Sequence, residues 1–303
     1  MWQVFLMYAL FGSIFSVGKI AVAASQPYFL TGMRMLIAGA LILMYLYCRD
    51  PKSLRLPRGC WATLFWVAVF NVFITNAFEF WGLQYMSAGK TCLIYSLSPF
   101  AAALIGYVTG AEWMSGKKWA GLIVGVMSFL PLMLAPWFEE GKTIDSVKEL
   151  WAEGALVVSA ITSVIGWILV KKLVVRESVS HPLVNGLSFV LAGVMCLATS
   201  ISVEAWDPVP VSQWGDFLWT LAYIVIIHNI ICYSIYASSL QRFTVTFMAF
   251  AGLSNPLFAG IFGWAFLGEQ MTLTFWLAMS GVCVGLYLYY QEETKPLADI
   301  RSV

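Results

Sequence analysis

The stretch SPFAAALIGYVTGAEWMSGKKW at residues 98–119 recurs as NPLFAGIFGWAFLGEQMTLTFW at residues 255–276, at an offset of 157 positions. Six of the 22 aligned positions are identical without a gap. They are Pro99 and Pro256, Ala102 and Ala259, Gly106 and Gly263, Glu112 and Glu269, Met114 and Met271, and Trp119 and Trp276. Apolar segments often resemble one another by chance, but shared proline, glutamate and tryptophan are hard to obtain that way. The match predicts a chain built from two related halves.

The composition places both halves in a membrane. Of the 303 residues, 60% are hydrophobic and 11% are charged, whereas soluble domains are about half apolar and a quarter charged. The mean hydropathy of +0.81 agrees. With about 20 apolar residues per spanning helix, the chain has room for about ten spans and no separate soluble catalytic domain. The net charge of +1 offers no basic face to a nucleic acid.

Apolar runs between charged residues or Pro and Gly breaks predict ten spanning helices. Their ranges are 2–22, 28–47, 61–81, 86–108, 117–136, 154–174, 183–203, 215–236, 244–266 and 272–290. Ala21–Ala23 resembles a signal-peptide cleavage site, but Lys19 lies inside the apolar run and no basic segment precedes it. We therefore interpret the first run as a span.

Basic residues predict the orientation of the spans. If the N-terminus is cytoplasmic, twelve basic residues fall on the inner side, whereas the outer loops hold only Lys142 and Lys148, with Lys90 near a helix end. The inner set is Arg49, Lys52, Arg55, Arg58, Lys117, Lys118, Lys171, Lys172, Arg176, Arg242, Lys295 and Arg301. This asymmetry predicts a multi-pass protein of the cell inner membrane with both termini in the cytoplasm.

An odd number of spans per half dictates that the halves have opposite orientations. The expected fold is an all-α membrane protein with ten transmembrane helices as two inverted five-helix repeats. Residues 1–136 form the first repeat, 137–153 an outer loop, 154–290 the second repeat and 291–303 a cytoplasmic tail. Two such bundles can expose a central site to either side in turn, which favours a secondary transporter over an enzyme or receptor.

Several motifs resemble the drug/metabolite transporter superfamily, in its EamA-like branch. They are Gly12-Ser13 followed by Lys19, the Pro27 to Arg34 opening of the second span, and Ser98-Pro99 with Glu112 and their copy at Asn255-Pro256 with Glu269. The resemblance covers nearly the whole chain. It implies two inverted repeats around a central cavity and no cofactor. Phe11 departs from the pattern, because many members have tryptophan there.

Four ionisable residues lie within predicted spans, where a charge is costly and therefore a functional candidate. They are Lys19, Arg34, Glu79 and Lys90, all in the outer third of the bilayer and in the first repeat. Their positive surplus predicts a substrate clamp or outer gate for a carboxylate. Two alternatives stay open: the basic chains reach the outer headgroups, or Glu79 pairs with Arg34. Glu79 could also bind a substrate cation or a coupling proton.

A second set of candidates lies nearer the bilayer midplane. The substrate-binding candidates there are Asn71, Tyr95, Ser98, His228, Asn229, Tyr233 and Asn255, and Trp167 could line a cavity. Ser98 and Asn255 each precede a proline, so Pro99 and Pro256 are candidate hinges at paired helix kinks. Static kinks and a hydrogen-bonded core histidine are the competing interpretations.

These residues suit a small zwitterion with an aromatic part. The expected function is secondary transport, by alternating access, of an amino acid or of an S-adenosylmethionine-like compound. The second candidate comes from the resemblance, because one branch of the superfamily has such a substrate. An exporter of drugs or other amphipathic metabolites is the alternative, with a channel or an intramembrane enzyme less favoured. No GxSxG, HExxH or CxxC motif occurs, so we expect no enzyme, metal or cofactor. The expected partners are a small-molecule substrate and the lipid bilayer, and a coupling proton or counter-substrate is left open. We expect the protein to be a monomer.

Overall fold

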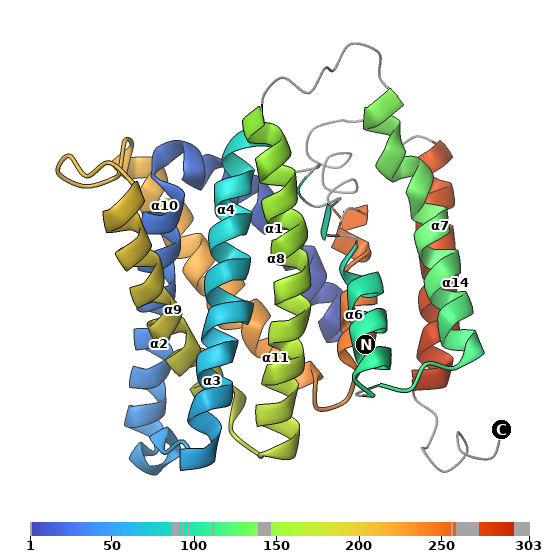
Figure 1. Ribbon diagram of the computed structural model, residues 1–303, viewed down its shortest axis with the longest axis horizontal. Coiled ribbons are helices and arrows are strands. Elements are labelled where there is room, and N and C mark those ends of the chain that lie inside the picture. The colour runs from blue at the N-terminus through green and yellow to red at the C-terminus, as the bar shows by residue number, and fades with distance from the viewer. Residues whose placement is uncertain are drawn as a thin grey trace.

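The computed structural model describes residues 2–86, 91, 94–95, 97–110, 112–138, 147–255, 257–258 and 273–293. These residues form a helical bundle, with one isolated bridge between Ser25 and Val211 as its β-type pairing (Figure 1). Within the described ranges, six helical rods are long and apolar enough to cross a membrane. They are Trp2–Ala24, Pro27–Arg49, Arg58–Tyr85, Leu150–Arg176, His181–Val203 and Trp214–Ser239. The prediction of an all-helical, multi-pass membrane protein is confirmed.

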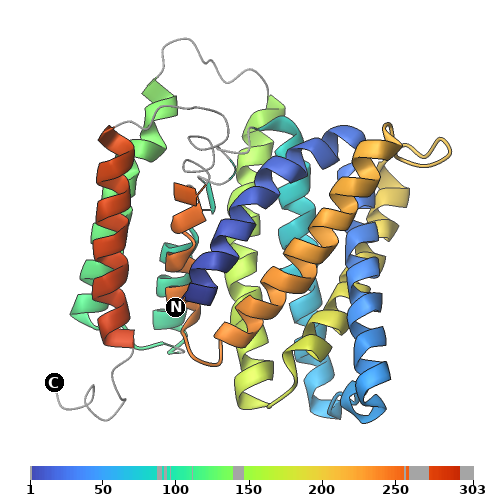
Figure 2. The same ribbon diagram turned by 180° about the vertical axis from the view of Figure 1, so that it is seen from behind.

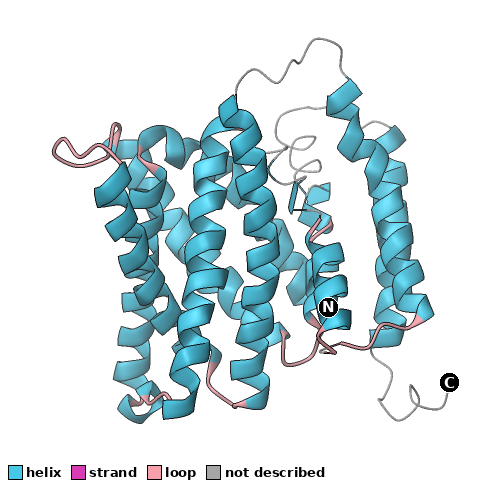
Figure 3. Ribbon diagram, in the orientation of Figure 1, coloured by secondary structure: helices cyan, strands magenta, loops and turns pink. Residues whose placement is uncertain are grey.

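The first half contains α1 (Trp2–Ala24), α2 (Pro27–Arg49), the short turns η1 (Pro51–Leu54) and η2 (Arg58–Cys60), a rod made of α3 (Trp61–Val67), η3 (Ala68–Ile74) and α4 (Thr75–Tyr85), then α6 (Ser98–Val108) and α7 (Gly116–Phe138). The second half contains α8 (Val147–Lys171) with η4 (Lys172–Arg176), α9 (His181–Val203), a rod made of α10 (Trp214–Tyr223), η5 (Ile224–Cys232) and α11 (Tyr233–Ser239), then α12 (Val245–Ala251) and α14 (Leu273–Glu293). Figure 3 shows the loops gathered at the two ends of the bundle.

Two of the predicted spans differ from the structure. The ranges 86–108 and 244–266 were expected to be kinked but continuous. A turn at Leu97 instead separates helical residues 94–95 from α6, which begins at Ser98, and a turn at 252–253 follows the end of α12 at Ala251 before helical residues 254–255. Pro99 occupies the first turn of α6, where its missing N–H breaks no helical hydrogen bond. The same ring inside a helix would clash with the preceding turn, so the chain starts a new helix instead of bending an old one. Pro256 lies outside the described residues.

Two carboxylates from distant loops cap helix starts. Glu204 accepts hydrogen bonds from the backbone N–H groups of Tyr28 (2.7 Å) and Phe29 (2.9 Å) at the start of α2. Glu112 accepts one from Val245 N–H (2.7 Å) at the start of α12. Negative charge at a helix N-terminus is favoured by the helix dipole and satisfies N–H groups that have no partner within the helix. These contacts tie helices of one half to loops of the other.

Three described segments are π-helical, η3, η4 and η5, and two of them, η3 and η5, lie at corresponding positions of the two halves. The offset of 157 places Ala68–Ile74 on residues 225–231, which fall inside the π-helical segment Ile224–Cys232. Such segments are rare and occur most often at functional sites. The amino-acid composition of these two segments does not predict a π-helix.

The helices that the repeat aligns with one another also pack against one another. α2 lies along α9, and α7 lies along α14, and in each pair the chain runs in opposite directions (Figures 1 and 2). Contact between α7 and α14 is close, because a Cβ atom built on Gly121 would lie 2.7 Å from the carbonyl oxygen of Gly285. The first helix of each half crosses to the other half: α1 packs on η5, and α8 packs on α4 and η3. These contacts are reciprocal.

Candidate functional site

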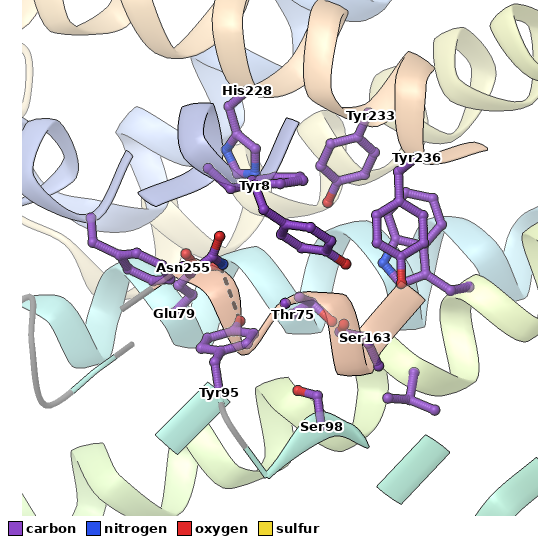
Figure 4. Close-up of a pocket in the computed structure, with 16 residues that line it drawn as sticks. Tyr8, Thr75, Glu79, Tyr95, Ser98, Ser163, His228, Tyr233, Tyr236 and Asn255 are labelled. Atoms are coloured by element: carbon purple, nitrogen blue, oxygen red, sulfur yellow. Dashed lines mark hydrogen bonds between the residues drawn. The ribbon is translucent and has the colours of Figure 1, made fainter. Parts of the chain in front are cut away.

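A cavity lies near the middle of the bundle between α1, α4, α6, α8, the η5–α11 rod and the segment that follows α12 (Figure 4). It contains about 790 Å³ of free space, its opening included. Its aromatic lining is Tyr8, Phe11, Phe15, Tyr95, Trp167, Tyr233 and Tyr236, and its polar lining is Thr75, Glu79, Ser98, Ser163, His228 and Asn255. Val164, Ala249 and Gly252 complete the wall.

The aromatic wall is built on three helices. Trp167 of α8 stacks on Tyr236 of α11, with ring centroids 3.8 Å apart and an interplanar angle of 17°. Tyr233, one turn earlier in α11, lies 5.1 Å from the Trp167 ring. Tyr8 of α1 donates a hydrogen bond to the backbone oxygen of Met248, which keeps its ring turned against this wall. The packed rings present flat apolar faces that suit a planar heterocycle or an onium cation.

Glu79 is the one residue of the cavity wall with an acidic side chain. The carboxylate is 8% exposed, and Tyr95 donates a hydrogen bond to its Oε2 atom at 3.0 Å, drawn as the dashed line in Figure 4. Tyr95 also bonds Ser159 of α8, whose hydroxyl donates to the backbone oxygen of Thr75 at 2.6 Å. No ion pair joins Glu79 to Arg34 within the described ranges. The predicted pair is therefore not formed in this conformation.

Arg34 is fully buried directly behind the cavity wall. Its Nη1 donates to His228 Nδ1 at 2.8 Å, its Nη2 donates to Asn76 Oδ1 at 2.7 Å, and its guanidinium carbon lies 4.1 Å from the centre of the Phe80 ring. A guanidinium only donates, so Nδ1 of His228 must be the unprotonated nitrogen and Nε2 carries the hydrogen. His228 therefore offers a donor to the cavity that it lines.

Asn76 and Tyr233 occupy corresponding positions of the two halves, 157 residues apart, and they touch. Asn76 Nδ2 donates to the Tyr233 hydroxyl at 3.1 Å. Asn71 and His228 also stand 157 residues apart, at corresponding positions, and the Tyr233 hydroxyl donates to the backbone oxygen of Asn71 at 3.4 Å. Arg34 thus bonds one member of each pair.

Ser98 and Asn255 bring unpaired oxygen atoms to the cavity. The Ser98 Oγ and Asn255 Oδ1 atoms are buried, and neither has a hydrogen-bond partner among the described residues. They are the first residues of the two repeated stretches, 98–119 and 255–276. A buried polar atom without a partner is costly, so the Ser98 hydroxyl is free to donate to or accept from a bound molecule, and Asn255 Oδ1 is free to accept.

The remaining predicted site residues lie elsewhere. Lys19 does not line the cavity: its ammonium group donates to the backbone oxygens of Leu83 (2.6 Å), Gln84 (3.3 Å) and Met86 (2.8 Å) at the end of α4. Asn229 is buried beside the cavity, where its Nδ2 donates to Met35 Sδ at 2.9 Å. Lys90 lies outside the described residues.

Sequence reasoning missed part of the lining. The missed residues are Tyr8, Phe15, Thr75, Ser163, Val164, Tyr236, Ala249 and Gly252, while Phe11 was noted only as a departure from a family pattern. Two of them had a signal. Thr75 lies one helical turn before Glu79, and Tyr236 lies three residues after Tyr233, which places each on the same helix face as a predicted residue. No group of described His, Cys, Asp and Glu residues could hold a metal ion.

The comparisons with known proteins agree with this architecture. The model of the EamA-like transporter family matches residues 1–134 and again residues 150–291. A "S-adenosylmethionine/S-adenosylhomocysteine transporter" of Chlamydia trachomatis serovar L2 is 37% identical over 297 residues, covering 96% of this chain and 89% of that protein. A protein of the same description from Chlamydia muridarum is also 37% identical, covering 96% of this chain and 92% of its own.

A solved crystal structure has the same fold. It superposes with a TM-score of 0.74 at 15% sequence identity and covers 96% of this chain and 95% of that chain.

Proposed function

This chain belongs to the EamA-like transporter family and is a membrane transporter, not an enzyme; on that premise we propose that it carries S-adenosylmethionine and S-adenosylhomocysteine. The 37% identity to the two chlamydial transporters over nearly the full length supports this substrate class. S-Adenosylmethionine combines an adenine ring, a sulfonium cation and an amino acid end. S-Adenosylhomocysteine lacks only the methyl group and therefore the sulfonium charge.

The observation that carries the proposal is one carboxylate set among aromatic faces. In our proposal Glu79 faces the sulfonium or ammonium group, since a cation in a desolvated site needs a counter-charge. Trp167 and Tyr236 pack on the adenine ring, and the aromatic lining adds cation–π attraction. Ser98, His228 and Asn255 supply polar contacts to the ribose or the amino acid end.

The carrier mechanism we propose is alternating access between two inverted five-helix repeats, residues 1–136 and 154–290. Three observations support it: the family model matches each half separately, the π-helical segments η3 and η5 correspond under the repeat offset, and aligned helices pack antiparallel on one another. Reciprocal contacts of this kind are what a two-fold axis produces. With the axis in the membrane plane, the halves can exchange conformations and turn the cavity from one side to the other. Pro99 and the equivalent Pro256 remain our candidates for the hinge positions.

Counterflow tests this function. Proteoliposomes that contain the purified chain and unlabelled S-adenosylhomocysteine should take up external labelled S-adenosylmethionine faster than the same vesicles loaded with buffer. A carrier shows this trans-stimulation because a loaded site returns faster than an empty one. Uptake that is equal in both vesicles would indicate a channel, and uptake no greater than in protein-free vesicles would exclude these substrates.

The topology we propose has both termini in the cytoplasm of the inner membrane. Single added cysteines at Arg55 and Arg176 should resist an impermeant thiol reagent in intact cells, whereas cysteines at Thr143 and Pro210 should react. The parent protein, with six native cysteines, measures the background. Reaction of position 55 before the cells are opened would contradict the assigned orientation.

A further inference from the structure

Arg34 is a buried cation that bonds no carboxylate among the described residues, and Glu79 acts on its charge only from beyond ion-pair distance. It is 0% exposed, its two bonded acceptors are the neutral side chains of His228 and Asn76, and its Nε atom has no hydrogen-bond partner. Arginine does not give up its proton in proteins. A buried charge that has no counter-charge in direct contact is costly, and helical membrane proteins keep one mainly for function. A negatively charged acceptor would therefore stabilise Arg34 better than the neutral side chains that it bonds in this structure.

The side chain of His228 lies between the Arg34 guanidinium and the cavity. The His228 ring lines the cavity (Figure 4). One edge of the ring accepts from Arg34, and the ring lies edge-on to Phe11 with centroids 5.2 Å apart. His228 belongs to the π-helical segment Ile224–Cys232. Such segments occur frequently at functional sites, and this one places His228 between Arg34 and the cavity.

We propose that the substrate's carboxylate replaces His228 as the acceptor for Arg34. In the empty carrier the imidazole Nδ1 atom takes the position of a carboxylate oxygen and shields the guanidinium from water. A bound amino acid end displaces the ring, and Nη1 of Arg34 then donates to the carboxylate in a charge-assisted hydrogen bond, which is roughly twice as strong as a neutral one. The positive charge of Arg34 thereby gains a carboxylate in direct contact when such a ligand is loaded.

This inference deepens the proposed function and assigns the two ends of the ligand. Glu79 faces the cation, and Arg34, reached through His228, recognises the carboxylate. The pocket would then discriminate against any adenosyl compound that lacks the carboxylate, because such a ligand leaves His228 in place. Neutral adenosyl thioethers without an amino acid end would be excluded on the same ground.

The test compares S-adenosylmethionine with its decarboxylated analogue. The parent should bind the full substrate at least tenfold more tightly, the difference expected for one charge-assisted hydrogen bond. In Arg34→Gln this preference should fall close to onefold. A preference that stays at tenfold in the variant would overturn the proposal.

A second measurement does not depend on the folding of an Arg34 variant. The chain has two histidines, so His181→Gln leaves His228 as the single imidazole observable by nitrogen NMR. S-Adenosylmethionine should shift its Nδ1 resonance and the decarboxylated analogue should not. Equal shifts from both ligands, or from neither, would exclude displacement of His228. If S-adenosylmethionine does not bind at all, the proposed function itself fails, which is a distinct result.

Discussion

Glu79→Gln should weaken binding of S-adenosylmethionine by roughly tenfold to a hundredfold and binding of S-adenosylhomocysteine by much less. A hydrogen bond or contact to a charged group in a desolvated site contributes about 1.5–3 kcal/mol, and about 1.4 kcal/mol is a factor of ten. The two ligands differ in the sulfonium charge, so only the first loses that attraction. Glutamine keeps the size of the side chain and an oxygen that accepts from Tyr95, so the local structure should persist. Equilibrium binding of both ligands to the purified protein measures the effect.

Lys19→Met is the matched control for this measurement. Sequence reasoning expected Lys19 to bind a carboxylate, but its ammonium group already donates to three backbone oxygens at the end of α4. We therefore expect the variant to bind both ligands like the parent while unfolding at a lower temperature. Equal losses of both ligands in Glu79→Gln would place the carboxylate at the shared ammonium group, and no loss would remove Glu79 from the site.

Gly166→Ala should be the most destabilising small substitution in α8. A Cβ atom built on Gly166 would lie 2.3 Å from the Cβ atom of Asn71, 2.4 Å from its Cα atom and 2.6 Å from its backbone nitrogen. Two of these atoms are main chain, so the clash cannot be relieved by a rotamer change. Overpacking typically costs about 1–3 kcal/mol, and we expect a cost at or above the upper end. Thermal unfolding in detergent, followed by tryptophan fluorescence, should show a melting temperature lower by roughly 5–10 °C.

Gly154→Ala in the same helix provides the control. A Cβ atom there would meet nothing within 4 Å, and alanine stabilises a helix relative to glycine by roughly 0.5–1 kcal/mol. The control should melt at or slightly above the parent's temperature. If both variants melt together, α8 can shift away from η3 without cost, and the packing described around Asn71 does not hold the helices in place.

Most of the helices could be predicted from the sequence because each apolar run ends at charges or at proline. The predicted range 28–47 became Pro27–Arg49, and 183–203 became His181–Val203. The break before Ser98 was not predicted, because hydropathy does not distinguish a bent helix from two helices. The π-helical segments were also missed, since they arise from packing rather than from residue propensity.

The site was predictable where polar groups interrupt apolar helices. Glu79, Tyr95, Ser98, His228, Tyr233 and Asn255 stand out in this way, Trp167 was proposed as a cavity aromatic, and all seven line the cavity. Apolar lining residues such as Phe15 and Val164 carry no such signal, because in the sequence an apolar residue that lines a cavity cannot be distinguished from one that faces lipid. Lys19 shows a limit of this reasoning: depth in the membrane identifies a side chain that needs polar partners, but not whether backbone oxygens or a ligand supply them.

The contact between Asn76 and Tyr233 has a consequence for ligand orientation. Two identical five-helix chains paired about a two-fold axis would have to place the same side chain on both sides of it, amide against amide or phenol against phenol. One continuous chain is free of that rule, and here an amide meets a phenol at 3.1 Å. A pocket with two equal walls would accept an unsymmetrical molecule in two reversed poses. Unequal walls permit a single pose, so a compound with a nucleoside at one end and an amino acid at the other is held the same way in every cycle.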